Sequence, residues 1–308
     1  MKIGYVLHGD FNDEKAWSGT FYNLANTIKK HHLIVPILVK PNKVEKIFKG
    51  IAFVASLGKR KNGILSRMYN KYRFRQTLKQ VDCDIYFAPA QSEFISFGIP
   101  QNRPLIYLSD AVFRLMIGYY WSDLDSKSEK YLDHCEKASL KRADAVIFSS
   151  EWAKDGAVRF YQTNPQKIHV LPFGANLVDK YQGYQENNLN DSAIRLLLVG
   201  VDWERKGINI AIDCVRALNK MQKDYSFDLT IIGVEKPAGQ EYESYIHILG
   251  RLDKNVPEEY ERMISYYQKS NLFILDNCKC KLNSCFNQEH LSIAWTSSRK
   301  WSKSSAGV

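Results

Sequence analysis

Residues 195–218 read RLLLVGVDWERKGINIAIDCVRAL, an apolar run that passes through a short polar loop into a stretch with helical spacing. The run at 195–200 predicts a buried strand, and the apolar residues of 208–218 recur as they do on a helix covered on one side. A strand followed by a helix is the repeating unit of a parallel sheet flanked by helices. This stretch therefore predicts an α/β fold.

The same alternation runs along most of the chain. Strands are expected at 2–9, 33–39, 85–89, 104–110, 145–150, 167–174, 195–200, 227–233, 246–250 and 271–275. The polar stretch VDKYQGYQENNLNDS at 178–192 interrupts the pattern and is typical of a linker. The sequence thus predicts two doubly wound α/β domains, in which ligands bind beyond the carboxyl ends of the strands.

The composition limits the possible classes of protein. With 308 residues, of which 45% are hydrophobic, the chain can bury a substantial core, which argues against a disordered protein. The N-terminus fits a first strand better than a signal peptide, and no apolar run is long enough to span a membrane. Cys83, Cys135 and Cys214 are scattered singly, as expected for thiols in the cytoplasm. The formal net charge of +10 predicts an anionic partner.

The loop after the strand at 195–200 carries Arg205, Lys206 and Gly207 directly before the predicted helix. The free N–H groups at a helix N-terminus attract anions, and two cationic side chains add charge-assisted hydrogen bonds. Gly207 would let the backbone turn tightly. These features predict a phosphate or diphosphate site, with a solvated basic turn as the alternative.

Several segments resemble a known family in their order and spacing. They are ASLKRADAVIFSSEWAKDGAVRFY, KIHVLPFGANL, LLLVGVDWERKGINIAIDCV, LTIIG, IHILGRLDK and YYQKSNLFIL. Together they are similar to the family 4 glycosyltransferases over residues 1 to about 275. The resemblance implies a GT-B fold of two Rossmann-like domains facing a cleft, with an acceptor-side domain at 1–177 and a nucleotide-sugar domain at 193–275.

The resemblance also implies a reaction. Such a chain would transfer a sugar from a nucleotide-diphosphate donor to a glycan or lipid-linked acceptor, with retention of configuration and with no metal or other cofactor. Its setting would be cell-surface polysaccharide synthesis in the cytoplasm. A sugar-nucleotide epimerase or phosphorylase on the same fold is an alternative, because it would bind the donor without a second sugar acceptor.

The resemblance assigns the donor site to particular residues. Arg205 and Lys206 would bind the donor diphosphate, and Gly19, in WSGT at 17–20, would face it from the other domain. The alternative for this stretch is a helix start capped by Ser18. Further residues expected to line the cleft are Ser18, Ser149, Glu151 and Gly200, although capping of a helix by Ser150 is the main role expected at 149–151.

On the acceptor side, Asp110 ends the predicted strand at 104–110. A carboxylate there could orient or deprotonate the acceptor hydroxyl, or it could cap a helix. His8 also ends a strand, but a lone histidine is more often used for packing or a local hydrogen bond.

Residues 40–80 contain twelve Lys and Arg against the single acid Glu45, interleaved with apolar and aromatic residues. This pattern predicts attachment to an anionic membrane surface, at about 1 kcal/mol per cation near the headgroups. An exposed basic helix without a membrane role is the alternative. Nucleic acid is not expected as a partner, because no nucleic-acid-binding motif accompanies the charge.

Residues 276–308 depart from the family. They lack the pair of glutamates, eight positions apart, that holds the donor sugar and ribose in the family, and they are rich in Cys, Ser, Trp and Lys. The change suggests a shifted reading frame or an early stop that leaves the second domain incomplete. The spacing of Cys278, Cys280, Cys285 and His290 is not typical of zinc sites. The alternative function is therefore a non-catalytic remnant that binds glycan or membrane without a complete donor site.

Overall fold

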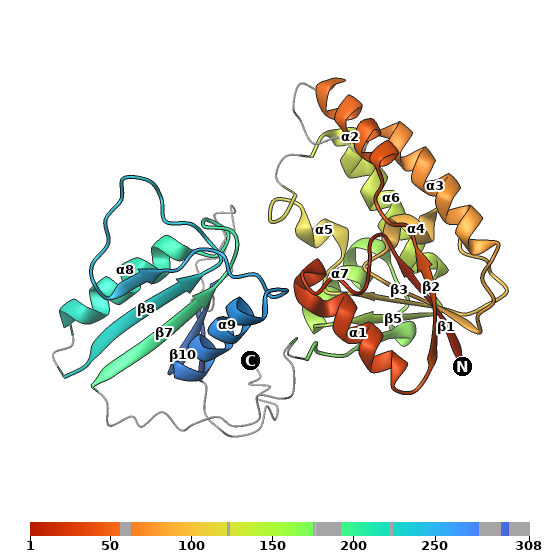
Figure 1. Cartoon of the computed structure of the whole chain (residues 1–308). Coiled ribbons are helices and arrows are strands. Elements are labelled where there is room, and N and C mark those ends of the chain that lie inside the picture. Colours follow the sequence, from red (N-terminus) through yellow and green to blue (C-terminus); the bar gives the residue numbers. More distant parts are fainter. Residues whose placement is uncertain are drawn as a thin grey trace. The chain divides into compact units, whose positions relative to one another are not determined.

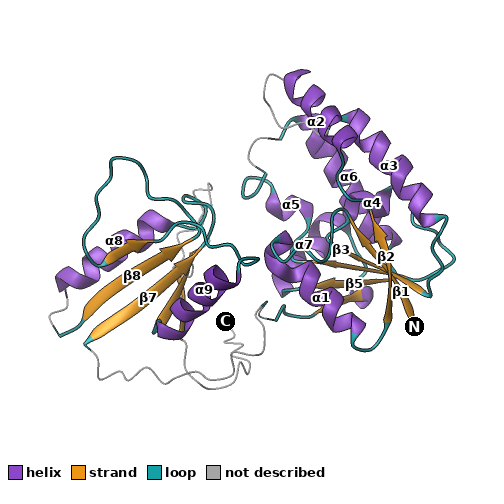
Figure 2. Cartoon of the chain, viewed as in Figure 1, coloured by secondary structure: helices purple, strands orange, loops and turns teal. Residues whose placement is uncertain are grey.

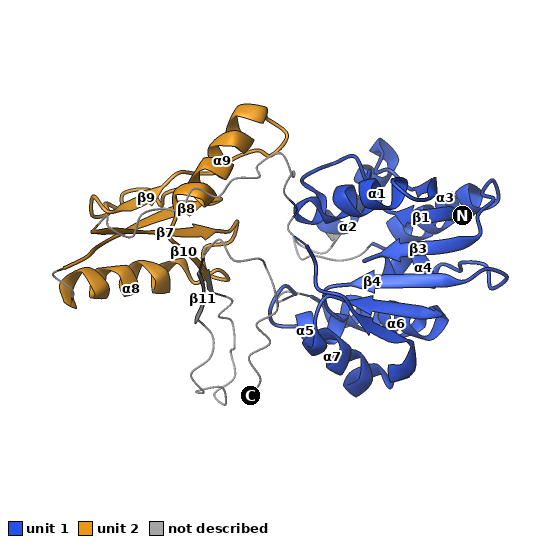
Figure 3. Cartoon of the chain, turned by 90° about the horizontal axis from the view of Figure 1, so that it is seen from below, with its two compact units in different colours: residues 1–176 blue, residues 177–308 orange. Residues whose placement is uncertain are grey.

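The computed structural model describes residues 1–55, 63–121, 124–174, 176, 192–221, 224–276 and 291–295. The chain divides into two compact units, Met1–Asn176 and Leu177–Val308 (Figure 3). The division falls one residue before the predicted end of the first domain at 177. Of the predicted linker at 178–192, all but Ser192 lies outside the described residues.

Within the described part of the first unit, six parallel strands form one sheet in the order β2-β1-β3-β4-β5-β6. The strands are β1 (Lys2–Leu7), β2 (Leu33–Leu38), β3 (Ile85–Pro89), β4 (Leu105–Ser109), β5 (Ala145–Phe148) and β6 (Ile168–Val170). Each lies inside an apolar run from which a strand is predicted.

Helices cover both faces of this sheet (Figures 1 and 2). They are α1 (Thr20–Lys29), α2 (Lys43–Ala55), α3 (Ile64–Leu78), α4 (Ser92–Ser96), α5 (Phe113–Met116), α6 (Ser126–Arg142) and α7 (Glu151–Tyr161), with short 3-10 turns at Ala16–Gly19 and Pro165–Lys167. Because side chains alternate along a strand, Tyr5 and Leu7 pack with α1, whereas Val6 packs on the other face with α3, α4, α6 and α7.

The second unit repeats this arrangement. Its described strands are β7 (Ala193–Val199), β8 (Ser226–Ile232), β9 (Ile246–Ile248), β10 (Leu272–Asp276) and β11 (Leu291–Trp295), in the order β11-β10-β7-β8-β9. α8 (Ile208–Met221) packs on Leu196 and Leu198, and α9 (Pro257–Lys269) packs on Leu197 from the opposite face. The predicted strand at 195–200 and the predicted helix at 208–218 are thus β7 and α8.

The C-terminal stretch contributes a strand that the sequence analysis did not predict. β11 pairs antiparallel with β10, with Leu272 opposite Trp295, whereas the other described pairs of this sheet are parallel. Its sequence, LSIAW, alternates over only five residues, which is too short a run to predict a strand inside a polar stretch. Residues 277–290, with Cys278, Cys280, Cys285 and His290, lie outside the described residues, as do 296–308.

Candidate active site

The loop between β7 and α8 is a tight turn closed by Asp202. The Arg205 backbone N–H donates to Asp202 Oδ1 at 2.8 Å, and the Lys206 N–H donates to the Asp202 carbonyl oxygen at 3.1 Å. Gly207 has a φ of 57°, in the left-handed region that favours glycine. The structure therefore confirms a tight turn at Gly207 directly before the helix.

The two cationic side chains of this loop differ in exposure. The Arg205 side chain is only 9% exposed, and its Nε lies 3.7 Å from Asp202 Oδ2. Lys206 is half-buried, and its stem crosses the end of β7 at Gly200. A Cβ atom at Gly200 would lie 2.6 Å from Lys206 Cγ, so only glycine leaves room for this stem. Arg205 is thus built into the turn, whereas Lys206 lies across the strand end.

Glycines end the neighbouring strands as well, and the sequence analysis missed this. The Gly200 N–H donates to the Ile232 carbonyl oxygen at 2.9 Å, and the Gly233 N–H donates to the Gly250 carbonyl oxygen at 2.8 Å. Gly233 has a φ of 110°, and a Cβ atom there would lie 2.4 Å from the Gly200 oxygen. The signal was present as a glycine at the last position of the predicted strands 195–200, 227–233 and 246–250. These glycines let the ends of the strands and the Lys206 stem pack closely together at this edge.

In the first unit, the loop after β1 enters α1 through three residues with positive φ: Trp17 at 49°, Ser18 at 57° and Gly19 at 90°. Asn176 holds this loop, because its Nδ2 donates to the Ser18 carbonyl oxygen at 3.2 Å and to Thr20 Oγ1 at 3.0 Å. The N-cap of α1 is Gly19 and no side chain caps the helix, so the alternative of a Ser18 cap is wrong. Such conformations cost free energy and recur at functional sites.

Asp110 lies beside this loop. The Trp17 indole donates to Asp110 Oδ2 at 3.4 Å, and the Ser149 hydroxyl donates to the Asp110 carbonyl oxygen at 3.4 Å. The N-cap of α5 is Val112, so Asp110 is not a helix cap, contrary to the alternative. The structure therefore brings Trp17, Asp110 and Ser149 together at the carboxyl edge of the first sheet.

Two predictions for the start of α7 have different outcomes. Ser150 is confirmed as the N-cap, since its Oγ accepts from the Ala153 N–H at 3.3 Å. Glu151 forms an ion pair with Lys154 at 2.9 Å, and its side chain is 67% exposed. No described contact joins Glu151 to Asp110, so its place in a ligand site stays a prediction.

At the same edge, the structure confirms the expected use of His8 in packing and a local hydrogen bond, although its partner Glu45 was not predicted. His8 Nε2 lies 3.2 Å from Glu45 Oε1, and the His8 ring stacks on Phe94 with centroids 5.3 Å apart. The Glu45 side chain is 1% exposed and pairs with Lys49 at 2.6 Å. Burial raises the pKa of the Glu45 carboxyl, but hydrogen bonds from Lys49 and Asn70 outweigh it and leave the pKa below its usual range. The available signal was that Glu45 is the single acid among twelve cations.

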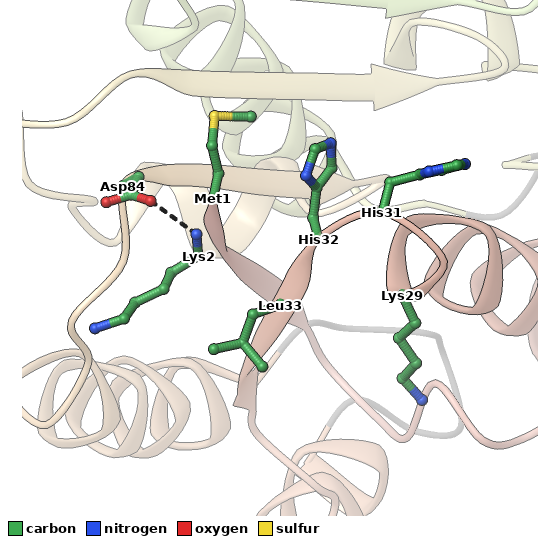
Figure 4. Close-up of a pocket in the computed structure, with 7 residues that line it drawn as sticks. All are labelled: Met1, Lys2, Lys29, His31, His32, Leu33 and Asp84. Carbon is green, nitrogen blue, oxygen red and sulfur yellow. Dashed lines mark hydrogen bonds between the residues drawn. The ribbon is translucent and has the colours of Figure 1, made fainter.

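The first unit also has a shallow pocket at the opposite edge, at the amino ends of β1 and β2 (Figure 4). Its lining residues are Met1, Lys2, Lys29, His31, His32, Leu33 and Asp84. Ligands of parallel α/β sheets bind at the carboxyl ends of the strands, so this pocket is not the candidate site. Across the described ranges, no group of three or more His, Cys, Asp or Glu could hold a metal ion.

Comparison with known families gives the class of protein. A model of Glycosyltransferase Family 4 matches residues 21–178, and the chain belongs to this family. A comparison with curated protein sequences gives no match. Among the helices of the described residues, none is long and apolar enough to cross a membrane.

Solved structures with the same fold include three of interest. One is described as trehalose-6-phosphate from E. coli bound with UDP-2-fluoro glucose, with a TM-score of 0.59 and 10% identity, covering 90% of this chain and 78% of that one. A UDP-forming α,α-trehalose-phosphate synthase from Burkholderia xenovorans has a TM-score of 0.55 and 10% identity, with 90% and 78% covered. WaaG, a glycosyltransferase involved in lipopolysaccharide biosynthesis, has a TM-score of 0.50 and 16% identity, with 90% and 75% covered. These similarities confirm the predicted GT-B class of fold.

Proposed function

We propose that the chain is a retaining, metal-independent glycosyltransferase that moves a sugar from a nucleotide-diphosphate donor to a glycan or lipid-linked acceptor. The observation that carries the proposal is the β7–α8 loop, where Lys206 lies beside a helix N-terminus at a glycine-lined strand edge. The family supports it, and so does the UDP named in two structures of the same fold. Cell-surface polysaccharide synthesis in the cytoplasm is the setting that this chemistry favours.

On the donor side, Lys206 and Arg205 would stabilise the negative charge that builds on the leaving diphosphate. Fixed cations and helix N–H groups act on such charge without reorganising, and this contribution is worth several kcal/mol in typical sites. Asp202 orders the turn, so it would position both cations before the donor binds. With charge neutralised by side chains, the proposed reaction needs no metal. The contact of Gly19 with the diphosphate stays a prediction.

On the acceptor side, we assign Asp110 as the group that binds and orients the attacking hydroxyl of the acceptor. The carboxylate accepts a long hydrogen bond of 3.4 Å from the Trp17 indole, and the residue is exposed at the sheet edge. A carboxylate in this position can accept a hydrogen bond or a proton from an alcohol. His8, paired with the buried Glu45, is a second polar group at the same edge that could contact the acceptor.

Transfer without metal is the first testable consequence. The full chain is incubated with UDP-, GDP- and ADP-sugars and solubilised bacterial lipids in EDTA, and release of nucleoside diphosphate is followed. We expect release with one donor, unchanged by EDTA, and a product whose anomeric configuration by NMR matches that of the donor. Asp110→Asn should lower acceptor-dependent release by about 10²-fold, in the range of general-base contributions.

Asp155→Asn is the matched control, because Asp155 is an exposed carboxylate on α7 of the same unit. Release that stops in EDTA, or an inverted product, would refute the proposed mechanism. A folded chain that binds no donor and releases nothing would instead support the non-catalytic remnant.

A further inference from the structure

Helices α2 and α3 lie side by side at one end of the first unit (Figure 1) and expose the residue types that helices normally bury. On α2, Ile47 is 59% exposed, Ile51 51% and Val54 76%, a spacing that places them on one face. On α3, Met68 is 63% exposed and Tyr72 62%. We call these residues, with Ile64, the apolar stripes of the α2–α3 hairpin.

The hairpin buries polar residues as well as the fully buried Phe74 of α3. α3 buries Ser66 and Asn70 at 5% and 7% exposure, and α2 buries Glu45 at 0%. Glu45 faces His8, and Asn70 helps to hold its charge. A helix in a globular protein normally packs most of its large apolar side chains on the core, but this pair leaves the apolar stripes exposed. Such a contiguous exposed apolar surface indicates a binding surface for a partner.

The charge of the two helices indicates which kind of partner covers the apolar stripes. The two helices carry seven cations, namely Lys43, Lys46, Lys49, Arg67, Lys71, Arg73 and Arg75. Their single acid is Glu45, which is buried. Two copies of such a face would repel each other, and nucleic acid would leave the apolar stripes in water. An anionic bilayer suits both the apolar stripes and the positive charge. The apolar side chains can enter the boundary between headgroups and acyl chains, while Lys and Arg contact the anionic headgroups.

We propose that the α2–α3 hairpin docks the chain on an anionic lipid leaflet by inserting its apolar stripes among the lipids. The inference rests on the proposed function and narrows it, since a docked enzyme takes a lipid-linked acceptor. The hairpin is joined to the carboxyl edge of the first sheet through Glu45, which lies 3.2 Å from His8. A lipid-linked acceptor would therefore meet the hairpin and the edge that carries Asp110 on the same unit.

The test is co-sedimentation of the full chain with vesicles of phosphatidylcholine, alone or mixed with phosphatidylglycerol. We expect binding to the mixed vesicles only. Ile47→Ser with Met68→Ser should lower the partition coefficient by tenfold or more, because a buried side chain of this size contributes roughly 1.5–3 kcal/mol. Lys43→Gln with Lys46→Gln should lower the partition coefficient by about 30-fold at low salt, at about 1 kcal/mol for each of the two cations.

Ile210→Ser is the matched control, because Ile210 is an apolar residue of α8 with 43% exposure in the other unit. Circular dichroism checks that each variant is folded. Equal binding of the apolar variant and the wild type would overturn the insertion. A dimer by light scattering that the apolar variant splits, without vesicle binding, would show a second copy as the true partner. Vesicle binding can be measured without a sugar donor. A chain that transfers sugar but does not bind vesicles would refute only this inference. A chain that binds vesicles but does not transfer sugar would refute only the proposed function.

Discussion

Lys206→Ala is expected to lower kcat/KM of sugar transfer by about 10²- to 10³-fold, the loss typical of removing one preorganised stabiliser of transition-state charge. The Lys206 stem crosses Gly200 at the end of β7, which holds the side chain at the strand edge. Because the diphosphate gains charge as the bond to the sugar breaks, we expect most of the loss in kcat. Steady-state kinetics with the donor found in the transfer assay measure it.

Two variants make this prediction specific. Lys220→Ala removes an exposed lysine from the last turn of the same helix and should leave the kinetics unchanged. Lys206→Arg keeps the positive charge and should recover a part of the rate. If Lys206→Ala and Lys220→Ala had the same small effect, the β7–α8 loop would not be the donor site.

Glu136→Gln is expected to stabilise the first unit, increasingly so as the pH rises. Glu136 lies on α6, fully inside the protein, and the Tyr107 hydroxyl donates to its Oε1 at 3.1 Å. Burial raises the pKa of Glu136 from 4.5 to about 8. Between pH 4.5 and about 8 the folded protein keeps the Glu136 proton, whereas the unfolded chain loses it. The free energy of unfolding of the wild type therefore falls as the pH rises through this range.

The full shift corresponds to about 5 kcal/mol in favour of the glutamine variant above about pH 8, and to little difference below about pH 4.5. Urea unfolding of the wild type, Glu136→Gln and Glu129→Gln over this range measures the difference. Glu129 is an exposed carboxylate on the same helix, so its variant should follow the wild type. If the difference in free energy of unfolding between Glu136→Gln and the wild type did not grow with pH, Glu136 would be ionised in the folded protein.

The strands were predictable because each apolar run is bounded by turn residues. The alternation of Tyr5, Val6 and Leu7 specifies two covered faces, and the structure has α1 on one and four helices on the other. β11 was not predictable, because pairing with β10 rather than a local pattern defines it. Local patterns also cannot show which side of an amphipathic helix faces the core. The exposed Met68 and the buried Asn70 of α3 required the structure.

The candidate site was predictable in part. The basic turn before α8 follows from Arg205, Lys206 and Gly207, whereas the burial of Arg205 depends on how Asp202 folds back onto it. The contact of His8 with Glu45 joins residues 37 positions apart, which local spacing cannot reveal. Ser18 was a reasonable helix cap by residue type, but its positive φ moved the N-cap to Gly19.

Calorimetric titration of the full chain with UDP, GDP and ADP in EDTA tests the central claim most directly. The wild type and Lys220→Ala should bind one of these nucleotides with equal affinity. Lys206→Ala should weaken that binding by about tenfold or more, since a charge-assisted hydrogen bond contributes roughly 1.5–3 kcal/mol, and Arg205→Ala with Lys206→Ala should abolish it. A folded wild type that binds none of the three, or a double variant that binds as well as the wild type, would contradict a nucleoside-diphosphate site at the β7–α8 loop.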